Sequence, residues 1–73
     1  MTTSAPFRRI RLSHVRLTPF GLSGIGFGSD ADGRPVSYLS DRWTLLRQSD
    51  ALAAGRAVEV YVVDREAVAW RRA

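Results

Sequence analysis

The apolar residues of the first segment change phase part-way along it. In "FRRIRLSHVRLTPF", Ile10 and Leu12 share one face of a strand, because strand side chains alternate faces with a period of two residues. After Ser13 the apolar positions become odd-numbered, at Val15 and Leu17. A shift of one residue inside a strand predicts a β-bulge, which bends the strand and increases its twist. A long, bent first strand is typical of a small closed barrel, where it contributes to both sheets.

A hairpin is predicted next. Ile25 and Phe27 lie on one face of a strand in "SGIGFGS", and three glycines lie on the other face or at its ends. The following "SDADG" reads as a turn, in which aspartates bond their own backbone and Gly33 takes a positive φ. Pro35 lacks an N–H donor and therefore belongs at an edge or at the start of the returning strand.

Residues 40–55 have helical spacing, with Ser40 or Asp41 as the N-cap and Gly55 as the end. The apolar stripe is weak, so one helix and two short helical turns both stay open. Two strands follow, "AVEVYVV" with its even-numbered valines inward, and "AVAW" with Val68 and Trp70 on one face. We expect Trp43 and Trp70 to lie in the core or to cover an edge.

The order is therefore three strands, a helical connection and two strands, within a chain of 73 residues that has room for one domain. We expect a frayed start at residues 1–6 and a single small β-barrel over residues 7–73. The fold class is mainly β with one short helix: a five-stranded OB-like barrel with the helical connection between strands 3 and 4. An SH3-like barrel is the alternative.

Three short stretches resemble the cold-shock domain: "GIGFG" with its turn, "VSYLS", and "LAAGRAVEVYV". The TRAM domain, a related RNA-binding barrel, is similar in "GIGFG", "DADGRPV" and "GRAVEVYV". The resemblance spans residues 10–70 and implies a single-strand-binding barrel. The chain departs from the cold-shock pattern, because Ile25 stands in place of an aromatic residue and Ser23 in place of a lysine. Pro35, Val36 and Ser37 also replace an aromatic-rich run, which implies a thinner stacking surface.

Charge and composition limit the ligands that the chain can bind and the reactions that it can catalyse. All 11 basic residues are arginine, the net charge is +4, and the first 28 residues carry four arginines and no acid. Such a basic segment attracts phosphate backbones or forms a solvated strand face. The sequence has no cysteine and only one histidine, His14, and this excludes disulfides, thiolate catalysis and a histidine metal cluster within the chain. We expect no enzymatic activity, no metal and no cofactor.

The glycine run does not fit a phosphate loop or a calcium loop. A dinucleotide fingerprint needs Gly-x-Gly-x-x-Gly before a helix, whereas here the third glycine comes one residue early and a hairpin follows. A calcium loop from Asp30 is broken by Arg34 and Pro35, and Asp41 stands where a glutamate is required.

The sequence thus predicts a module that binds RNA or single-stranded DNA. Phosphates would be held by Arg9, Arg11 and Arg16, bases would stack on Phe27 and Tyr38, and His14 and Arg34 would lie at the rim. Phe27 as a plain core residue is the slightly favoured alternative to its stacking role. The alternative function is a protein-interaction module or small accessory subunit without nucleic-acid binding, in which the outward Tyr61 and Val63 meet a partner or a second copy. No apolar run approaches membrane-spanning length and residues 1–6 lack a signal pattern, so we expect a cytoplasmic protein.

Overall fold

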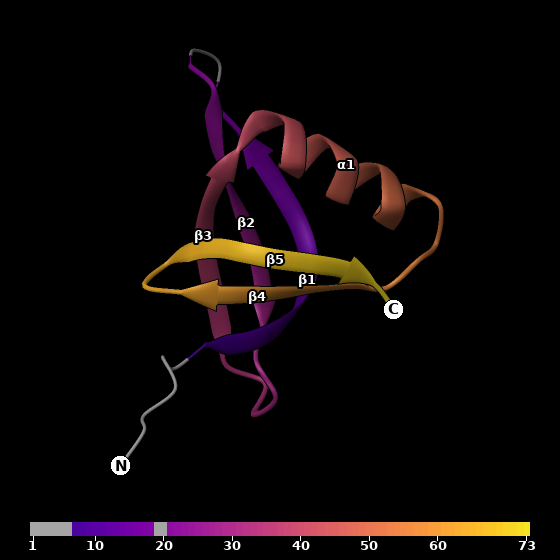
Figure 1. Cartoon of the computed structure of the whole chain (residues 1–73). Coiled ribbons are helices and arrows are strands. Elements are labelled where there is room, and N and C mark those ends of the chain that lie inside the picture. The colour runs from indigo at the N-terminus through magenta and orange to yellow at the C-terminus, as the bar shows by residue number, and fades with distance from the viewer. Residues whose placement is uncertain (1–6, 19–20) are drawn as a thin grey trace.

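The computed structural model describes residues 7–18 and 21–73 as a small β-barrel (Figure 1). Its elements are β1 (Arg8–Leu17), β2 (Ser23–Ser29), β3 (Pro35–Asp41), α1 (Arg42–Ala53), β4 (Val58–Val63) and β5 (Glu66–Arg72). The strands close in the order β1-β2-β3-β5-β4, and β4 pairs with β1. Only the β3–β5 pairing is parallel, and it rests on one residue pair. The expected five-stranded, OB-like barrel with a helix between β3 and β4 is confirmed. The frayed start predicted for residues 1–6 lies outside the described residues.

The predicted bulge in β1 is confirmed at Ser13. In the β1–β2 ladder Leu12 pairs with Gly28 and His14 pairs with Phe27, so Ser13 has no partner. The first half of β1 pairs with β4, from Arg8 to Arg11, and the second half pairs mainly with β2. Because the strand bends at the bulge, the side chains of its two halves lie over different sheets.

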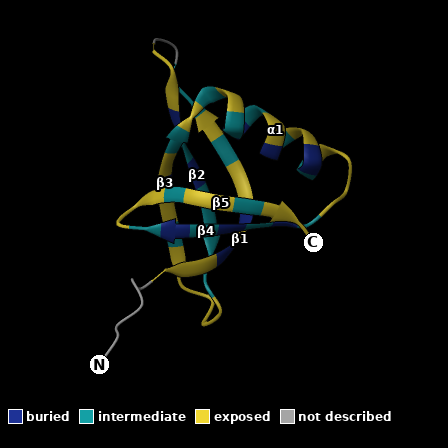
Figure 2. Ribbon diagram, viewed as in Figure 1, coloured by how far each residue is buried: buried dark blue, intermediate teal, exposed yellow. Residues whose placement is uncertain are grey.

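The fully buried side chains come from β1, β3, α1 and β4 (Figure 2), and Ala67 and Trp70 of β5 pack against them. Val58, Val60 and Val62 alternate inward along β4 as predicted, and Val15 and Leu17 pack against the core from the far half of β1. The buried apolar residues are Ile10, Leu12, Tyr38, Leu45, Ala51, Val58, Val60 and Val62.

Glycines form the inner face of β2 because neighbouring side chains occupy the space beside it. Gly26 pairs with Tyr38 across the β2–β3 ladder, and a Cβ at Gly26 would overlap the Tyr38 ring. A Cβ at Gly24 would lie 2.6 Å from the backbone oxygen of Arg16 and 2.8 Å from Leu45 Cδ1, both closer than real Cβ atoms approach. The glycine run therefore admits two large core side chains, one from β3 and one from α1.

Helix α1 is a single helix with both predicted ends. Asp41 is the N-cap, and its carboxylate accepts hydrogen bonds from the Thr44 backbone N–H at 3.0 Å and the Thr44 hydroxyl at 2.6 Å. At the other end the Gly55 N–H donates to Leu52 O and the Arg56 N–H to Ala51 O, with Gly55 at φ +81°. These two bonds and the left-handed glycine form a Schellman motif that terminates the helix.

Two expectations for the tryptophans and β5 need correction. Trp43 is 70% exposed and is not part of the core. In the β4–β5 ladder the register shifts between the Tyr61–Ala69 and Val62–Ala67 pairs, so Val68 has no partner and is exposed. Trp70 is half-buried against the core. The bulge at Val68 was not predicted, because no apolar phase shift marks it in so short a strand.

Candidate nucleic-acid interface

The outer surface of the β1–β2–β3 sheet carries two rows of neighbouring side chains. One row is His14, Phe27 and Ser37, and the next is Arg16, Ile25 and Leu39, as the ladder pairings place them. We call these six residues the stacking face. Its members alternate with the inward glycines of β2 and with buried Tyr38 of β3, so strand alternation places them on the outside.

His14, which was predicted at the rim of the site, instead forms an aromatic stack with Phe27 on this face. Their ring centroids are 4.8 Å apart and their planes differ by 16°. His14 Nδ1 lies 3.0 Å from the Ser13 hydroxyl, which sets the orientation of the imidazole beside the bulge. Phe27 is half-buried and lies outside the core, so the favoured expectation that it is a core residue is wrong. The cause is the inward placement of the glycines, which leaves the other face of β2 for Ile25 and Phe27.

A shallow apolar pocket lies next to the stack. It has a volume of about 470 Å³ and is lined by Ser13, His14, Phe27, Gly28, Pro35, Val36 and Ser37. Ser37 is the β3 partner of Phe27, and its short side chain does not fill the space beside the phenyl ring. A planar group placed there would extend the two-ring stack to a third layer.

Tyr38 cannot contribute to such a surface. Its side chain is 1% exposed inside the barrel, where its hydroxyl donates a 2.6 Å hydrogen bond to Gln48 Oε1. Burial raises the pKa of the phenol well above its ordinary value and keeps it neutral. A base cannot stack on a buried ring, so the stacking role predicted for Tyr38 is wrong. The ring instead fills the space over Gly26 and joins β3 to α1.

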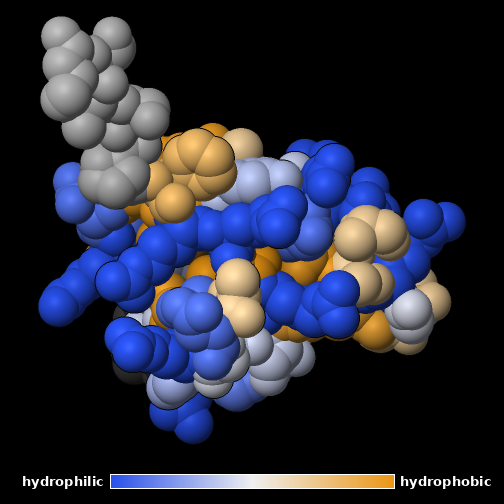
Figure 3. Space-filling view, turned by 90° about the horizontal axis from the view of Figure 1, so that it is seen from below, coloured by the Kyte–Doolittle hydropathy of each residue, from blue (hydrophilic) through white to orange (hydrophobic). Residues whose placement is uncertain are grey.

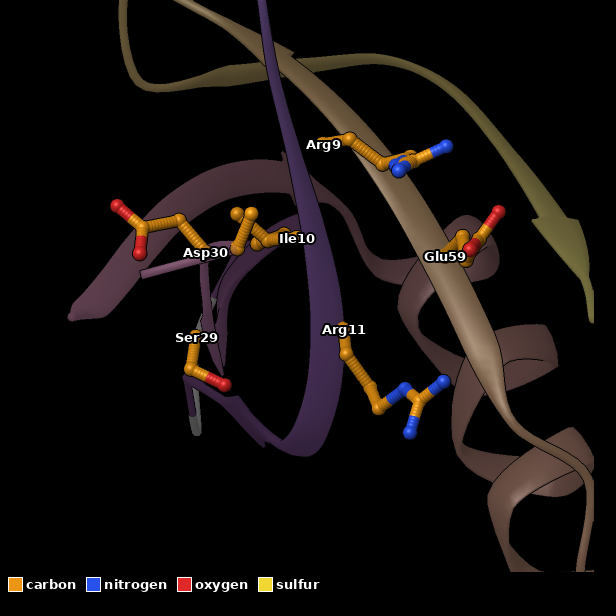
Figure 4. Close-up of a pocket in the computed structure, with 7 residues that line it drawn as sticks. Arg9, Ile10, Arg11, Ser29, Asp30 and Glu59 are labelled. Atoms are coloured by element: carbon orange, nitrogen blue, oxygen red, sulfur yellow. The ribbon is translucent and has the colours of Figure 1, made fainter. Parts of the chain in front are cut away.

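Arg9 and Arg11 are exposed, as predicted, but they do not lie on the stacking face. They precede the bulge and point to the β4 side of β1, toward Glu59, across a hollow of about 290 Å³ (Figure 4). Glu59 accepts a 2.9 Å bond from Arg71, and this bond together with the charges of Arg71, Arg9 and Arg11 lowers the pKa of its carboxyl group. The carboxylate therefore offsets part of the positive charge on this side.

Arg34 lies at the tip of the β2–β3 hairpin. Its backbone N–H and that of Asp32 both donate to Asp30 Oδ1 at 2.9 Å, and Gly33 has φ +79° as the turn prediction requires. The side chain is exposed and belongs to the end of the barrel opposite α1. It does not line the pocket beside Phe27.

Two arginines near the stacking face were missing from the predicted site. Arg8 and Arg65 line a hollow of about 720 Å³ together with Pro35, Val36, Ser37, Val62 and Asp64. This hollow shares Pro35, Val36 and Ser37 with the pocket beside Phe27. Its lining residues come from the start of β1, the start of β3, the end of β4 and the turn that follows β4. Seen from below, the molecule shows hydrophobic surface between blue hydrophilic side chains (Figure 3).

The sequence pattern did not identify these two arginines as site residues. Arg8 has the strand phase of inward Ile10, but it lies at the mouth of the barrel and is exposed. Arg65 lies in the turn between β4 and β5, where Asp64 and Arg65 adopt positive φ angles of 50° and 70°. The closeness of these two residues depends on the pairing of β1 with β4, which the sequence pattern does not determine.

Comparison of the chain with protein-family models, with curated proteins and with solved structures found no match in any of the three. In residues 7–18 and 21–73, no helix has the length and apolar character needed to cross a membrane. The same residues hold no group of three or more histidine, cysteine, aspartate or glutamate side chains arranged to bind a metal ion.

Proposed function

We propose that the barrel binds single-stranded nucleic acid, RNA or DNA, through the stacking face. The observation that carries the proposal is the His14–Phe27 stack, which stands on the outside of the sheet beside an unfilled apolar pocket. A nucleobase is a planar group that extends such a stack, and base–aromatic stacking contributes about 1–3 kcal/mol per base. Bases are free to stack in this way only where the strand is unpaired.

Arginines stand on both sides of the stack. Arg16 lies in the row next to His14, and Arg8 and Arg65 lie beyond Ser37, across β3. A strand whose base covers Phe27 would bring its flanking phosphates toward these guanidinium groups. Arg9, Arg11 and Arg34 add positive charge from neighbouring surfaces and attract the strand at longer range.

The barrel architecture supports the same surface. OB-fold barrels bind oligonucleotides and oligosaccharides on the face of strands 2 and 3 and on adjacent loops. The resemblance to cold-shock and TRAM domains agrees with this choice of ligand. Fold does not determine function by itself, so the proposal rests on the stack and its arginines, with the architecture as supporting analogy.

The test is fluorescence anisotropy of labelled single-stranded RNA and DNA oligonucleotides at a low and a high salt concentration. We expect binding at low salt that weakens as salt rises, because neutralised phosphates release counterions. Arg16→Gln should reduce the slope of log affinity against log salt by about 0.7, the value for one contact to a single strand.

Arg56→Gln is the matched control, since Arg56 is exposed in the loop between α1 and β4, away from the stacking face. It removes the same charge and should leave the slope nearly unchanged. Absence of binding to either oligonucleotide at low salt would overturn the proposal. Equal effects of the two substitutions on the slope would show that affinity depends only on net charge, and this would contradict binding through the stacking face.

A further inference from the structure

The large hydrophobic side chains that the barrel exposes are not scattered. Within the described part of the chain they are Phe7, Leu22, Leu39, Trp43 and Val68, each more than half exposed. Leu22, Leu39 and Val68 line one groove of about 560 Å³, together with Ser23, Ser40, Asp41, Glu66 and Ala67. Trp43 is close to this groove, because the N–H of the preceding Arg42 donates to Leu22 O at 2.7 Å. Contiguous exposed apolar surface of this kind marks an interaction site.

The charges that line this groove are negative. Among the residues that the structure describes, Asp41 and Glu66 are the only charged ones that line it, and hydrogen bonds from Thr44 lower the pKa of Asp41 so that its carboxylate is ionised. The chain as a whole has a net charge of +4, and the other hollows described above contain arginine or histidine. We call this surface the acidic groove. Its carboxylates disfavour phosphate groups and favour an apolar side chain with basic neighbours.

The remaining exposed hydrophobic residue has those properties. Phe7 is 57% exposed and is followed by Arg8 and Arg9, both exposed. Its ring contacts Tyr61 edge-on, with centroids 5.6 Å apart, which holds it at the surface. We call Phe7, Arg8 and Arg9 the basic end. Leu22 lies beyond the far end of the ten-residue strand β1 from the basic end, whereas Ala67 of the groove lies two strands from Arg8, because Arg8 pairs with Val62 and Val62 pairs with Ala67.

We propose that the basic end of one molecule docks in the acidic groove of a second copy. The two surfaces match in polarity and charge, and together they hold four of the five large hydrophobic side chains that the described residues expose, all but Trp43. Past Glu66, β5 pairs with no described strand on the side away from β4, and this edge offers main-chain hydrogen bonds to an incoming extended segment. Because the contact joins two different surfaces, two copies can make it twice in a closed dimer or once with one surface of each kind left free, and in both cases association grows with concentration.

The test is sedimentation velocity over a range of protein concentrations without nucleic acid, so its outcome is independent of the proposed function. The wild-type weight-average mass should rise to at least twice the monomer mass. Val68→Glu blocks the groove and Phe7→Glu blocks the basic end, and each variant alone should remain monomeric. An equimolar mixture retains one intact groove and one intact basic end, so it should form a heterodimer of twice the monomer mass and nothing larger.

Two substitutions with the same change of charge test whether a carboxylate of the acidic groove contributes to association. Glu66→Arg should weaken association at least tenfold, whereas Asp50→Arg makes the same charge change on the exposed side of α1, outside the groove, and should leave it unchanged. All four positions are exposed, and circular dichroism checks that each variant folds. A wild-type protein that stays monomeric, a Phe7→Glu variant that assembles like the wild type, or a mixture without heterodimer would each overturn the proposal. Leu22→Glu gives a second block of the groove should Val68→Glu unfold.

Discussion

The two faces of β2 differ in what determines their residues. On the inner face, a side chain at Gly26 would overlap the Tyr38 ring, and one at Gly24 would meet the Arg16 backbone oxygen and Leu45. On the outer face, Ile25 and Phe27 are half-buried, and Phe27 packs on exposed His14 rather than on the core. Packing inside the barrel thus requires the glycines of the inner face, whereas it does not require an aromatic residue at position 27 on the outer face. That difference makes Phe27 the better candidate for function.

The largest effect is expected on the inner face. Gly26→Val places two methyl groups where the Tyr38 ring lies, and this ring is fixed by its bond to Gln48. Overpacking of this kind destabilises by about 1–3 kcal/mol, and more where the neighbour cannot move. We expect the upper end of that range or complete unfolding, measured by urea denaturation.

Ile25→Val on the opposite face is the control for this prediction. It removes one methylene from a half-buried side chain and should cost less than about 1 kcal/mol. Equal stability of the two variants would mean that the glycine is not required by the Tyr38 ring, and the contrast between the faces would disappear.

The second effect concerns the hydrogen bond that joins the inner face to α1. Tyr38→Phe leaves Gln48 Oε1 without its donor, and Gln48 is fully buried with no partner for its Nε2 in the described structure. A buried polar atom left unsatisfied costs about 1–3 kcal/mol. Replacing both partners, as Tyr38→Phe with Gln48→Met, should recover much of the loss in a urea denaturation experiment.

Tyr38→Phe also sharpens the comparison between the faces. Because the ring is buried, oligonucleotide affinity should change by less than about twofold while stability falls. A large loss of affinity in a folded Tyr38→Phe protein would restore Tyr38 to the binding surface and contradict the division into an inner and an outer face.

Much of the barrel followed from local patterns in the sequence. The phase shift at Ser13, the alternating valines of β4, the Asp41 cap and the Gly55 terminus each act within a few residues, and each is confirmed. Such features are readable because strand period, bulges and caps depend on neighbouring positions.

The parts that failed depend on contacts between distant residues. Tyr38 is inward because its ladder partner is Gly26 and its hydroxyl meets Gln48, ten residues further along the chain. The strand alternation alone allows an aromatic residue to face either the interior or the solvent. The pairing of β3 with the glycine-rich β2 decides that Tyr38 faces the interior. The bend that separates Arg9 and Arg11 from Phe27 was predicted from the sequence. Which surface of the barrel each half of β1 contributes to depends on its partner strand, and the sequence pattern does not identify that strand.

The third effect is expected on the outer face and in affinity rather than stability. Phe27→Ala removes the ring on which a base would stack and should weaken binding of a single-stranded oligonucleotide about 5- to 150-fold, corresponding to 1–3 kcal/mol. Its cost in unfolding free energy should be smaller than that of Gly26→Val, since Phe27 is outside the core. Fluorescence anisotropy and urea denaturation on the same samples give both quantities.

Two variants serve as controls for Phe27→Ala. Phe27→Tyr keeps an aromatic ring and should retain most of the affinity. Trp43→Ala removes a more exposed ring near the acidic groove and should leave oligonucleotide affinity unchanged. If Trp43→Ala weakened binding as much as Phe27→Ala, exposed aromatic area in general would account for affinity, and the special position of the outer face of β2 would be lost.

The smallest effect is a pH dependence of stability that originates at Asp41. Asp41 caps the helix that supplies Leu45 and Gln48 to the interior, and hydrogen bonds from Thr44 lower the pKa of its carboxyl group below its ordinary value of 3.8. A lowered pKa in the folded state means that the carboxylate stabilises the fold above the ordinary pKa and that this stabilisation is lost as the pH falls through the folded-state value. We therefore expect stability to decline as the pH drops below about 4.

Asp41→Asn keeps a capping side chain that does not titrate, so its stability should depend less steeply on pH in urea denaturation between neutral pH and pH 3. At neutral pH the variant should bind oligonucleotides as the wild type does, because the cap acts on the inner face through α1. An unchanged pH profile in Asp41→Asn would assign the decline to other carboxylates, such as Glu59, whose pKa is lowered by Arg71 on the far side of the barrel wall.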